Sequence, residues 1–190
     1  MVIGVPIPNN YFAPWEAVKC FLEVATTYPI TYSQGPYIYD NRNQLLKFAK
    51  SHDQAILMID SDIIFSMVDV LKMEGHLIDK DIVTGVYCLG TAPYPAAILE
   101  KKEKHYRFVP PPTELAEIDA CGGGFLGISQ KVVREMNDHA FDNVWEAGVP
   151  HGEDISFCHR AKEKGFKVWC DPTIRLGQVR SGTIYYGYKG

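Results

Sequence analysis

The sequence predicts an α/β fold with a Rossmann-like parallel first half and a mixed central sheet flanked by helices. Through residues 2–75, apolar runs of strand length alternate with segments of helical periodicity, as expected when helices connect parallel strands. After residue 81, several strand-like segments follow one another, which indicates that some of them run antiparallel. A chain of 190 residues fits a single domain.

The expected strands are short apolar runs bounded by Pro, Gly or Asn. The first of them ends where the run meets Pro8. The segment from Gly177 onward is rich in Gly and Tyr, and we interpret it as a loop able to order over a ligand. The strands are expected at residues 2–7, 30–33, 55–59, 81–87, 96–99, 106–109, 124–128 and 167–170.

The expected helices show apolar residues three or four positions apart. The first helix would place Val18, Leu22 and Ala25 on one face. Another opens at Ser66, where Asp69 three residues later resembles a capping box. The helices are expected at about residues 14–26, 40–50, 130–137 and 153–164, and from residue 66 onward.

The composition excludes several classes of protein. The net charge of -4 gives no electrostatic reason to expect nucleic-acid binding. The five cysteines include no C-x-x-C pair, so neither a zinc site nor a disulfide framework is indicated, and reduced thiols are expected. No apolar stretch approaches the roughly 18 residues of a membrane span, and the N-terminus lacks the basic segment of a signal peptide. We therefore expect a cytoplasmic protein without a membrane span.

Two carboxylates, Asp60 and Asp62, directly follow the apolar run at 55–59. Ligands of α/β proteins collect at the carboxyl ends of the strands, so this strand end is a candidate site. Hard carboxylate oxygens suit Mg²⁺ or Mn²⁺, which can in turn hold the phosphates of a nucleotide. The alternative is a surface turn, for which Asp-Ser-Asp is an ordinary sequence.

Arg42 shares the core-facing side of its expected helix with Leu45 and Leu46. A guanidinium on that side needs an anion. The anion is either a structural partner, Asp40 or Asp60, or a phosphate bound at the start of the helix.

Glu153 and Asp154 open a later helix, and Asp154 lies at the leading edge of its apolar face. The helix dipole alone favours acids in a first turn, and a carboxylate placed there is also a candidate general base. The glycine run that includes Gly123 and Gly124 lies beside Asp119 and continues into strand-like sequence. It therefore fits a dinucleotide fingerprint poorly, and either a simple turn or a close approach of substrate to the backbone explains it.

This ordered series of motifs, over roughly residues 2–178, resembles the GT-A-fold glycosyltransferases, the nucleotide-sugar transferases typified by glycosyltransferase family 2. The resemblance implies one GT-A domain over residues 1–190, with a donor half at about 1–90 and an acceptor and catalytic half at about 91–190. The residues that carry it are Val2 to Pro6, Asn41-Arg42-Asn43, Asp60-Ser61-Asp62, Asp119 with Gly122-Gly123-Gly124-Phe125, and Glu153-Asp154 followed by Phe157-Cys158 and Arg160.

The resemblance also implies roles for individual residues. Asp60 and Asp62 would hold Mn²⁺ or Mg²⁺ on the donor diphosphate. Gln178 stands near the position where many family members have a metal-binding histidine, so it is the third candidate ligand. Glu153 and Asp154 form the catalytic motif, with Asp154 as the base of an inverting transfer. The residues implied to bind the donor are Pro6, Asn9, Arg42, Asp60, Ser61, Asp62, Asp119, Gly123 and Gly124.

The implied partners are a nucleotide-diphosphate sugar, with UDP- and GDP-sugars favoured, and an acceptor hydroxyl on a glycan, a protein or a lipid-linked molecule. Three other functions remain open. A haloacid-dehalogenase-type phosphatase also uses D-x-D, but Ile64 stands where its motif has Thr or Val. A sugar-nucleotide nucleotidyltransferase has a Gly-rich basic loop after its first strand, and this chain has Pro8-Asn9-Asn10 there. The third is a non-catalytic module that binds a carbohydrate or a sugar nucleotide.

Overall fold

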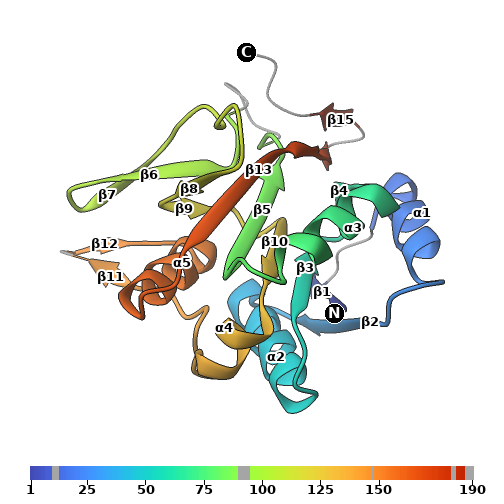
Figure 1. Cartoon of the computed structure of the whole chain (residues 1–190), viewed down its shortest axis with the longest axis horizontal. Helices are drawn as coiled ribbons and strands as arrows, with labels where there is room; N and C mark the ends of the chain where they lie inside the picture. The colour runs from blue at the N-terminus through green and yellow to red at the C-terminus, as the bar shows by residue number, and fades with distance from the viewer. Residues whose placement is uncertain (10–12, 90–94, 147, 181–182, 187–190) are drawn as a thin grey trace.

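The computed structural model of the chain describes residues 1–9, 13–89, 95–146, 148–180 and 183–186. Within these ranges a mixed central sheet of seven strands is covered by five helices (Figure 1). The helices are α1 (Trp15–Val24), α2 (Ile38–Ser51), α3 (Met67–His76), α4 (Gln130–Glu135) and α5 (Glu153–Glu163).

The central sheet has the strand order β2-β1-β3-β10-β5-β13-β8. Strand β1 is parallel to both β2 and β3, as the sequence predicts for the first half, and β13 is parallel to β5. Strand β10 lies between β3 and β5 and is antiparallel to both, so β3 and β5 point the same way. The strands are β1 (Val2–Pro8), β2 (Ile30–Gly35), β3 (Ile56–Ile59), β5 (Ile82–Val86), β8 (Ala116–Ile118), β10 (Phe125–Ile128) and β13 (Val168–Arg175).

Three smaller sheets flank the central one. The first joins β4 (Ile63–Ile64), β14 (Gly177–Arg180) and β15 (Thr183–Tyr186). The second joins β6 (Ile98–Lys102), β7 (His105–Phe108) and β9 (Ala120–Cys121), and the third pairs β11 (Trp145–Glu146) with β12 (Val149–Pro150). The loop expected from residue 177 onward is therefore wrong for β14 and β15. The backbone of β14 instead pairs with β4, where Gln178 lies opposite Ile63.

The hydrophobic core has two parts, one on each face of the central sheet. Side chains of β3 alternate between them, with Ile56 and Met58 in one part and Leu57 and Ile59 in the other. Helices α2, α4 and α5 cover the first face, and α1 and α3 lie together on the second (Figure 1). Because both faces are covered, the inner strands are continuous apolar runs.

The capping box of α3 is confirmed, because Ser66 accepts from the Asp69 amide and Asp69 accepts from the Ser66 amide. The face expected for α1, with Val18, Leu22 and Ala25, is not the one that packs on the core, since Leu22 is 59% exposed. The helix instead buries a stripe that includes Ala17 and Val24, next to Phe21, whose ring packs edge-on against Phe65 at 5.1 Å between centroids. Contact with Phe65 sets the rotation of this short helix.

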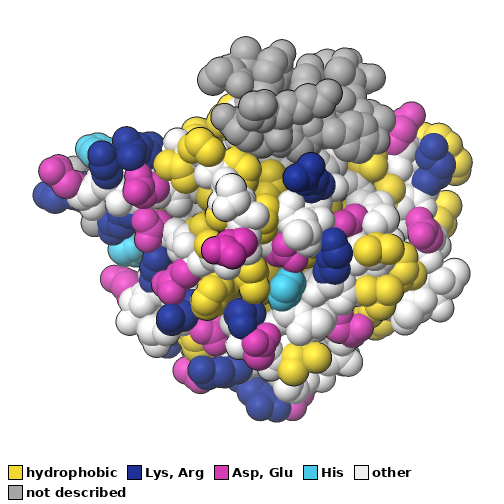
Figure 2. Space-filling view, turned by 45° about the horizontal axis from the view of Figure 1, so that its top comes forward, with side chains coloured by type: hydrophobic (Ala, Val, Ile, Leu, Met, Phe, Trp, Pro, Cys, Tyr) yellow, Lys and Arg dark blue, Asp and Glu magenta, His cyan; other side chains and the backbone are white. Residues whose placement is uncertain are grey.

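None of the helices in the described part of the chain is both long and apolar enough to cross a membrane. On the face shown in Figure 2, basic and acidic side chains are interspersed among apolar ones.

Gly85 of β5 lies against an irregular part of β13, where the register shifts between Cys170 and Arg175. A Cβ atom at Gly85 would lie 2.5 Å from Ile174 Cγ2 and 2.8 Å from the Ile174 carbonyl oxygen. We expect Gly85→Ala to lower the free energy of unfolding by about 1–3 kcal/mol, because backbone cannot move aside as a flexible side chain can.

The matched control is Gly75→Ala at an exposed position of α3, where a Cβ meets no atom within 4 Å. It should raise stability by about 0.5–1 kcal/mol through helix propensity. Urea unfolding of the two variants measures both effects, and equal stabilities would contradict the packing described at Gly85.

Candidate functional site

The candidate site lies where the carboxyl ends of β1, β3 and β5 meet the start of β10. Asp60 directly follows β3 and Tyr87 directly follows β5. Because β10 is antiparallel to these strands, the glycines that precede it arrive at the same edge. This edge of an α/β sheet is where ligands are expected.

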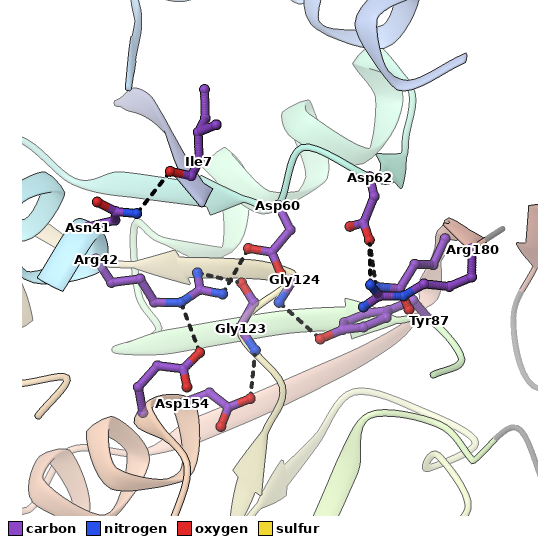
Figure 3. A network of polar contacts seen from close by, with 12 residues as sticks. Ile7, Asn41, Arg42, Asp60, Asp62, Tyr87, Gly123, Gly124, Asp154 and Arg180 are labelled. Carbon is purple, nitrogen blue, oxygen red and sulfur yellow. Dashed lines mark hydrogen bonds and ion pairs between the residues drawn. The ribbon is translucent and has the colours of Figure 1, made fainter. Parts of the chain in front are cut away.

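Arg42 of α2 lies at the centre of the site, and its side chain is only 2% exposed. Its Nη2 donates to Asp60 Oδ1 at 2.8 Å, and its Nη1 donates to the Gly123 carbonyl at 3.0 Å. Its Nε lies 3.5 Å from Glu153 Oε1. Figure 3 shows the guanidinium between α5 and the end of β3. Of the partners that the sequence left open, Asp60 is the one that forms an ion pair with Arg42.

The positive charge of Arg42 is stabilised by the neighbouring carboxylates. Burial by itself lowers the pKa of Arg42, but the negative charges of Asp60, Glu153 and Asp154 outweigh burial and raise it. Arg42 therefore stays cationic. Arg42 thereby contacts both acidic motifs, through Asp60 after β3 and through Glu153 at the start of α5.

The two asparagines beside Arg42 hold α2 in place. The Asn41 amide donates to the Ile7 carbonyl at 3.0 Å, which fixes the end of β1. The Asn43 side chain donates to Asp142 Oδ1 at 2.7 Å and accepts from the Phe141 amide at 2.9 Å. Both asparagines are buried, so the Asn-Arg-Asn segment sets the position of the guanidinium from both sides.

The glycine run makes room for two side chains of the protein. A Cβ atom at Gly123 would lie 2.7 Å from Arg42 Cζ, and one at Gly124 would lie 2.8 Å from Tyr87 Cζ. The Gly124 amide donates to the Tyr87 hydroxyl at 2.9 Å. The sequence left open a simple turn or a close approach of substrate, and in the structure Arg42 and Tyr87 approach these glycines closely.

Asp154 faces the same glycine run from the first turn of α5. Its Oδ2 accepts from the Gly123 amide at 3.2 Å, and its Oδ1 accepts from the Ile155 amide at 2.8 Å. Burial, followed by the charge of Glu153, raises the pKa of Asp154 to about 6, against the opposing charge of Arg42. A carboxylate with a pKa near 6 can accept a proton close to neutral pH, as a general base must.

Asp62 is almost fully buried and lies beside β14. Arg180 Nη1 lies 3.3 Å from Asp62 Oδ2, and one polar atom of the Gln178 amide lies 3.3 Å from the same oxygen. With the amide oriented so that its nitrogen donates to the Cys88 carbonyl at 3.1 Å, its oxygen accepts from Arg180 Nη2 at 3.0 Å. This orientation satisfies the Cys88 carbonyl and Arg180, whereas the opposite one lets the amide nitrogen donate to Asp62; in the former, the Asp62 and Gln178 oxygens both face Arg180.

A cavity of about 160 Å³ opens between β1, α2 and the two aspartates. Its size suits part of a nucleotide rather than a whole one. Asn9 follows the lining residue Pro8 and is exposed. The backbone amide of Asn9 donates to the Gly35 carbonyl at 3.1 Å. The cavity is lined by Pro6, Pro8, Ile38, Asp60, Ser61, Asp62 and Arg180.

Asp119 is not brought together with the other expected residues. Its carboxylate accepts from Lys162 Nζ at 2.6 Å and from the Lys101 amide at 2.9 Å. It lines a separate cavity of about 380 Å³, together with apolar side chains such as Leu99 and Val109. Asp119 lies between β8 and β9, and its carboxylate is bonded to the backbone of β6.

Two of the site residues, Tyr87 and Arg180, were not predicted from the sequence. Tyr87 was placed in a strand, yet the strand-end argument used for Asp60 applies equally to it. Arg180 gave no signal, because the segment that carries it was interpreted as a loop.

The residues suited to a divalent cation are Asp60 and Asp62. Their oxygens are hard donors, and Mg²⁺ is commonly bound by one or two carboxylates together with substrate phosphates. Within the described ranges, no group of three or more His, Cys, Asp or Glu side chains could hold a metal by itself. The donor set therefore fits a cation that brings further ligands with its substrate.

Replacing Arg42 should lower the free energy of unfolding. In Arg42→Gln, Asp60 and Glu153 lose their shared counter-charge, and removing one partner from a buried ion pair costs about 3–5 kcal/mol. Urea unfolding should show this loss. The control Arg134→Gln removes a fully exposed ion pair with Asp53 and should change stability little. Equal effects of the two substitutions would contradict the central role of Arg42.

The raised pKa of Asp154 predicts a pH-dependent stability. The folded chain binds this proton more tightly than the unfolded chain, so the stabilisation is complete at acidic pH and is lost as pH rises through about 6. Between about pH 4 and pH 8 the wild type should lose roughly 1–3 kcal/mol relative to Asp154→Asn. Urea unfolding of both proteins across this range measures it. A difference that does not vary with pH would show that Asp154 titrates normally.

Comparison with known proteins shows likeness in structure alone: no family model matches the chain, and no curated protein matches its sequence. The structure of A197 from STIV is similar over 100% of this chain and 96% of that one, with a TM-score of 0.73 and 17% identity. GalNAc-T7, crystallised with UDP, GalNAc and Mn²⁺, is similar over 95% of this chain, with a TM-score of 0.58 and 13% identity. The chain spans 44% of the GalNAc-T7 chain. The inositol-1-phosphate CTP transferase from T. maritima matches over 90% of this chain and 84% of its own, with a TM-score of 0.49 and 11% identity. At these identities, the likeness to A197 and to GalNAc-T7 is one of fold.

Proposed function

We propose that the chain is a GT-A-type glycosyltransferase that moves a sugar from a nucleotide-diphosphate sugar to an acceptor hydroxyl. The observation that carries the proposal is the Arg42 cluster. It joins Asp60, at the edge of a cavity, to the Glu153-Asp154 motif through one buried guanidinium. A donor-binding carboxylate and a candidate base are thereby held on either side of the glycine run. The likeness in fold to GalNAc-T7 supports the same class of activity.

The donor would bind at the cavity beside Asp60 and Asp62. Pro6 and Pro8 supply apolar surface for the nucleotide, and Arg180 supplies positive charge for the diphosphate. Asp60 and Asp62 would hold Mn²⁺ or Mg²⁺, which neutralises the leaving diphosphate when bound. Because the cavity is small, the remainder of the donor would lie outside it.

Asp154 would remove the proton from the acceptor hydroxyl. Each carboxylate oxygen already accepts one backbone hydrogen bond, which fixes the orientation of the group and leaves lone pairs for the substrate. Glu153 contacts Arg42 instead, so it would act by positioning. A single base facing the acceptor is the arrangement of an inverting transfer, and the acceptor is a hydroxyl of a glycan, a protein or a lipid-linked molecule.

The proposal is tested first by binding. A panel of UDP- and GDP-sugars, each with and without Mn²⁺, is measured by the shift in unfolding temperature. One donor should stabilise the wild type more with Mn²⁺ than without it. Asp62→Asn should lose the Mn²⁺-dependent part of the shift, whereas Asp79→Asn, an exposed carboxylate on the surface, should keep it.

Activity is tested with the donor found in that panel. Asp154→Asn should bind the donor as the wild type does, yet transfer or hydrolyse the sugar about 10²–10⁴-fold more slowly. Normal turnover by Asp154→Asn would refute the assigned base. Donor binding without any turnover by the wild type would favour a non-catalytic module, and phosphate release from simple phosphomonoesters would favour a phosphatase.

A further inference from the structure

Both aspartates of the D-x-D motif are paired with an arginine, but the two arginines differ in their exposure to solvent. Arg42, on Asp60, is 2% exposed and is held by three groups. Arg180, on Asp62, is 50% exposed and lines the cavity. Arg180 can therefore leave its carboxylate for solvent or for a ligand, whereas Arg42 cannot.

The oxygens around Arg180 are those that a divalent cation would use. Asp62 Oδ2 lies 3.3 Å from the guanidinium, and the Gln178 oxygen accepts from Nη2 at 3.0 Å. Gln178 is itself buried and is held by its bond to the Cys88 carbonyl. A carboxylate oxygen and an amide oxygen facing one positive group is also how proteins coordinate hard cations.

We propose that the Arg180 guanidinium competes with a divalent cation for the same oxygens of the donor site. Its guanidinium faces both Asp62 and Gln178, and a divalent cation can bind these two oxygens only when Arg180 moves out. This inference rests on the proposed function for the identity of the diphosphate ligand, but the competition between Arg180 and the metal does not depend on it.

The donor diphosphate would provide the new partner for Arg180. Arg180 lines the cavity that also holds Asp60 and Asp62, so phosphate groups bound there lie within its reach. Metal and diphosphate would then favour each other: the diphosphate draws Arg180 from Asp62, and the metal replaces it. Such coupling is reciprocal, so each ligand tightens the other by the same factor.

The first experiment uses Mn²⁺ alone. Free Mn²⁺ is measured by its electron paramagnetic resonance signal during titration of wild type, Arg180→Gln and Arg180→Lys. Arg180→Gln should bind Mn²⁺ about tenfold more tightly than the wild type, because a competing cation is gone. Arg180→Lys keeps the charge and should stay close to the wild type. The control Arg175→Gln, an exposed arginine bonded to the Pro172 carbonyl, should change nothing.

An unchanged or weakened Mn²⁺ affinity in Arg180→Gln would overturn the inference. No nucleotide is present in this titration, so its outcome is independent of the glycosyltransferase proposal.

The second experiment adds UDP. In the wild type, UDP should tighten Mn²⁺ binding by a larger factor than in Arg180→Gln, because only the wild type must first displace the guanidinium. Equal factors in the two proteins would overturn the inference even if a nucleotide sugar binds normally. If neither UDP- nor GDP-sugars bind the wild type with Mn²⁺ present, the proposed function fails, while the result with Mn²⁺ alone still decides the role of Arg180.

Discussion

A guanidinium that is 2% exposed has almost no water around it, so its charge must be met by groups of the protein itself. For Arg42 these groups come from three parts of the chain: the end of β3, the glycine run before β10 and the first turn of α5. None of these segments can move far without leaving a buried charge uncompensated. The geometry of the site is therefore determined by the electrostatic needs of one side chain.

The glycine run completes the same constraint in steric terms. The space beside it is filled by Tyr87 and Arg42, and any side chain on Gly123 would collide with the guanidinium. The Gly123 carbonyl binds Arg42 while its amide binds Asp154, so one peptide segment links the cation to the candidate base. The raised pKa of Asp154 follows from this enclosure, because burial opposes ionisation more strongly than Arg42 favours it.

Much of the fold could be predicted from periodicity, because each strand and helix is encoded by neighbouring residues. The parallel first half, the capping box at Ser66 and the antiparallel strands of the second half are all observed. What depends on distant contacts could not be predicted. The face that α1 turns to the core depends on the packing of Phe21 against Phe65. Asp119 pairs with Lys162 and lines a different cavity. The pairing of Arg180 with Asp62 needs β14 to lie against β4, which no local pattern encodes.

Strand β10, from the later part of the chain, joins two strands from the earlier part. Strands β3 and β5 both belong to the first 90 residues, yet they are joined in the sheet only through β10, which the chain reaches at residue 125. A fragment that ended before the glycine run would expose two unpaired strand edges at its centre and would lack the Gly123 carbonyl that accepts from Arg42. The first 90 residues and the later part of the chain are thus interleaved in one sheet, which is held together by contacts between residues far apart in sequence.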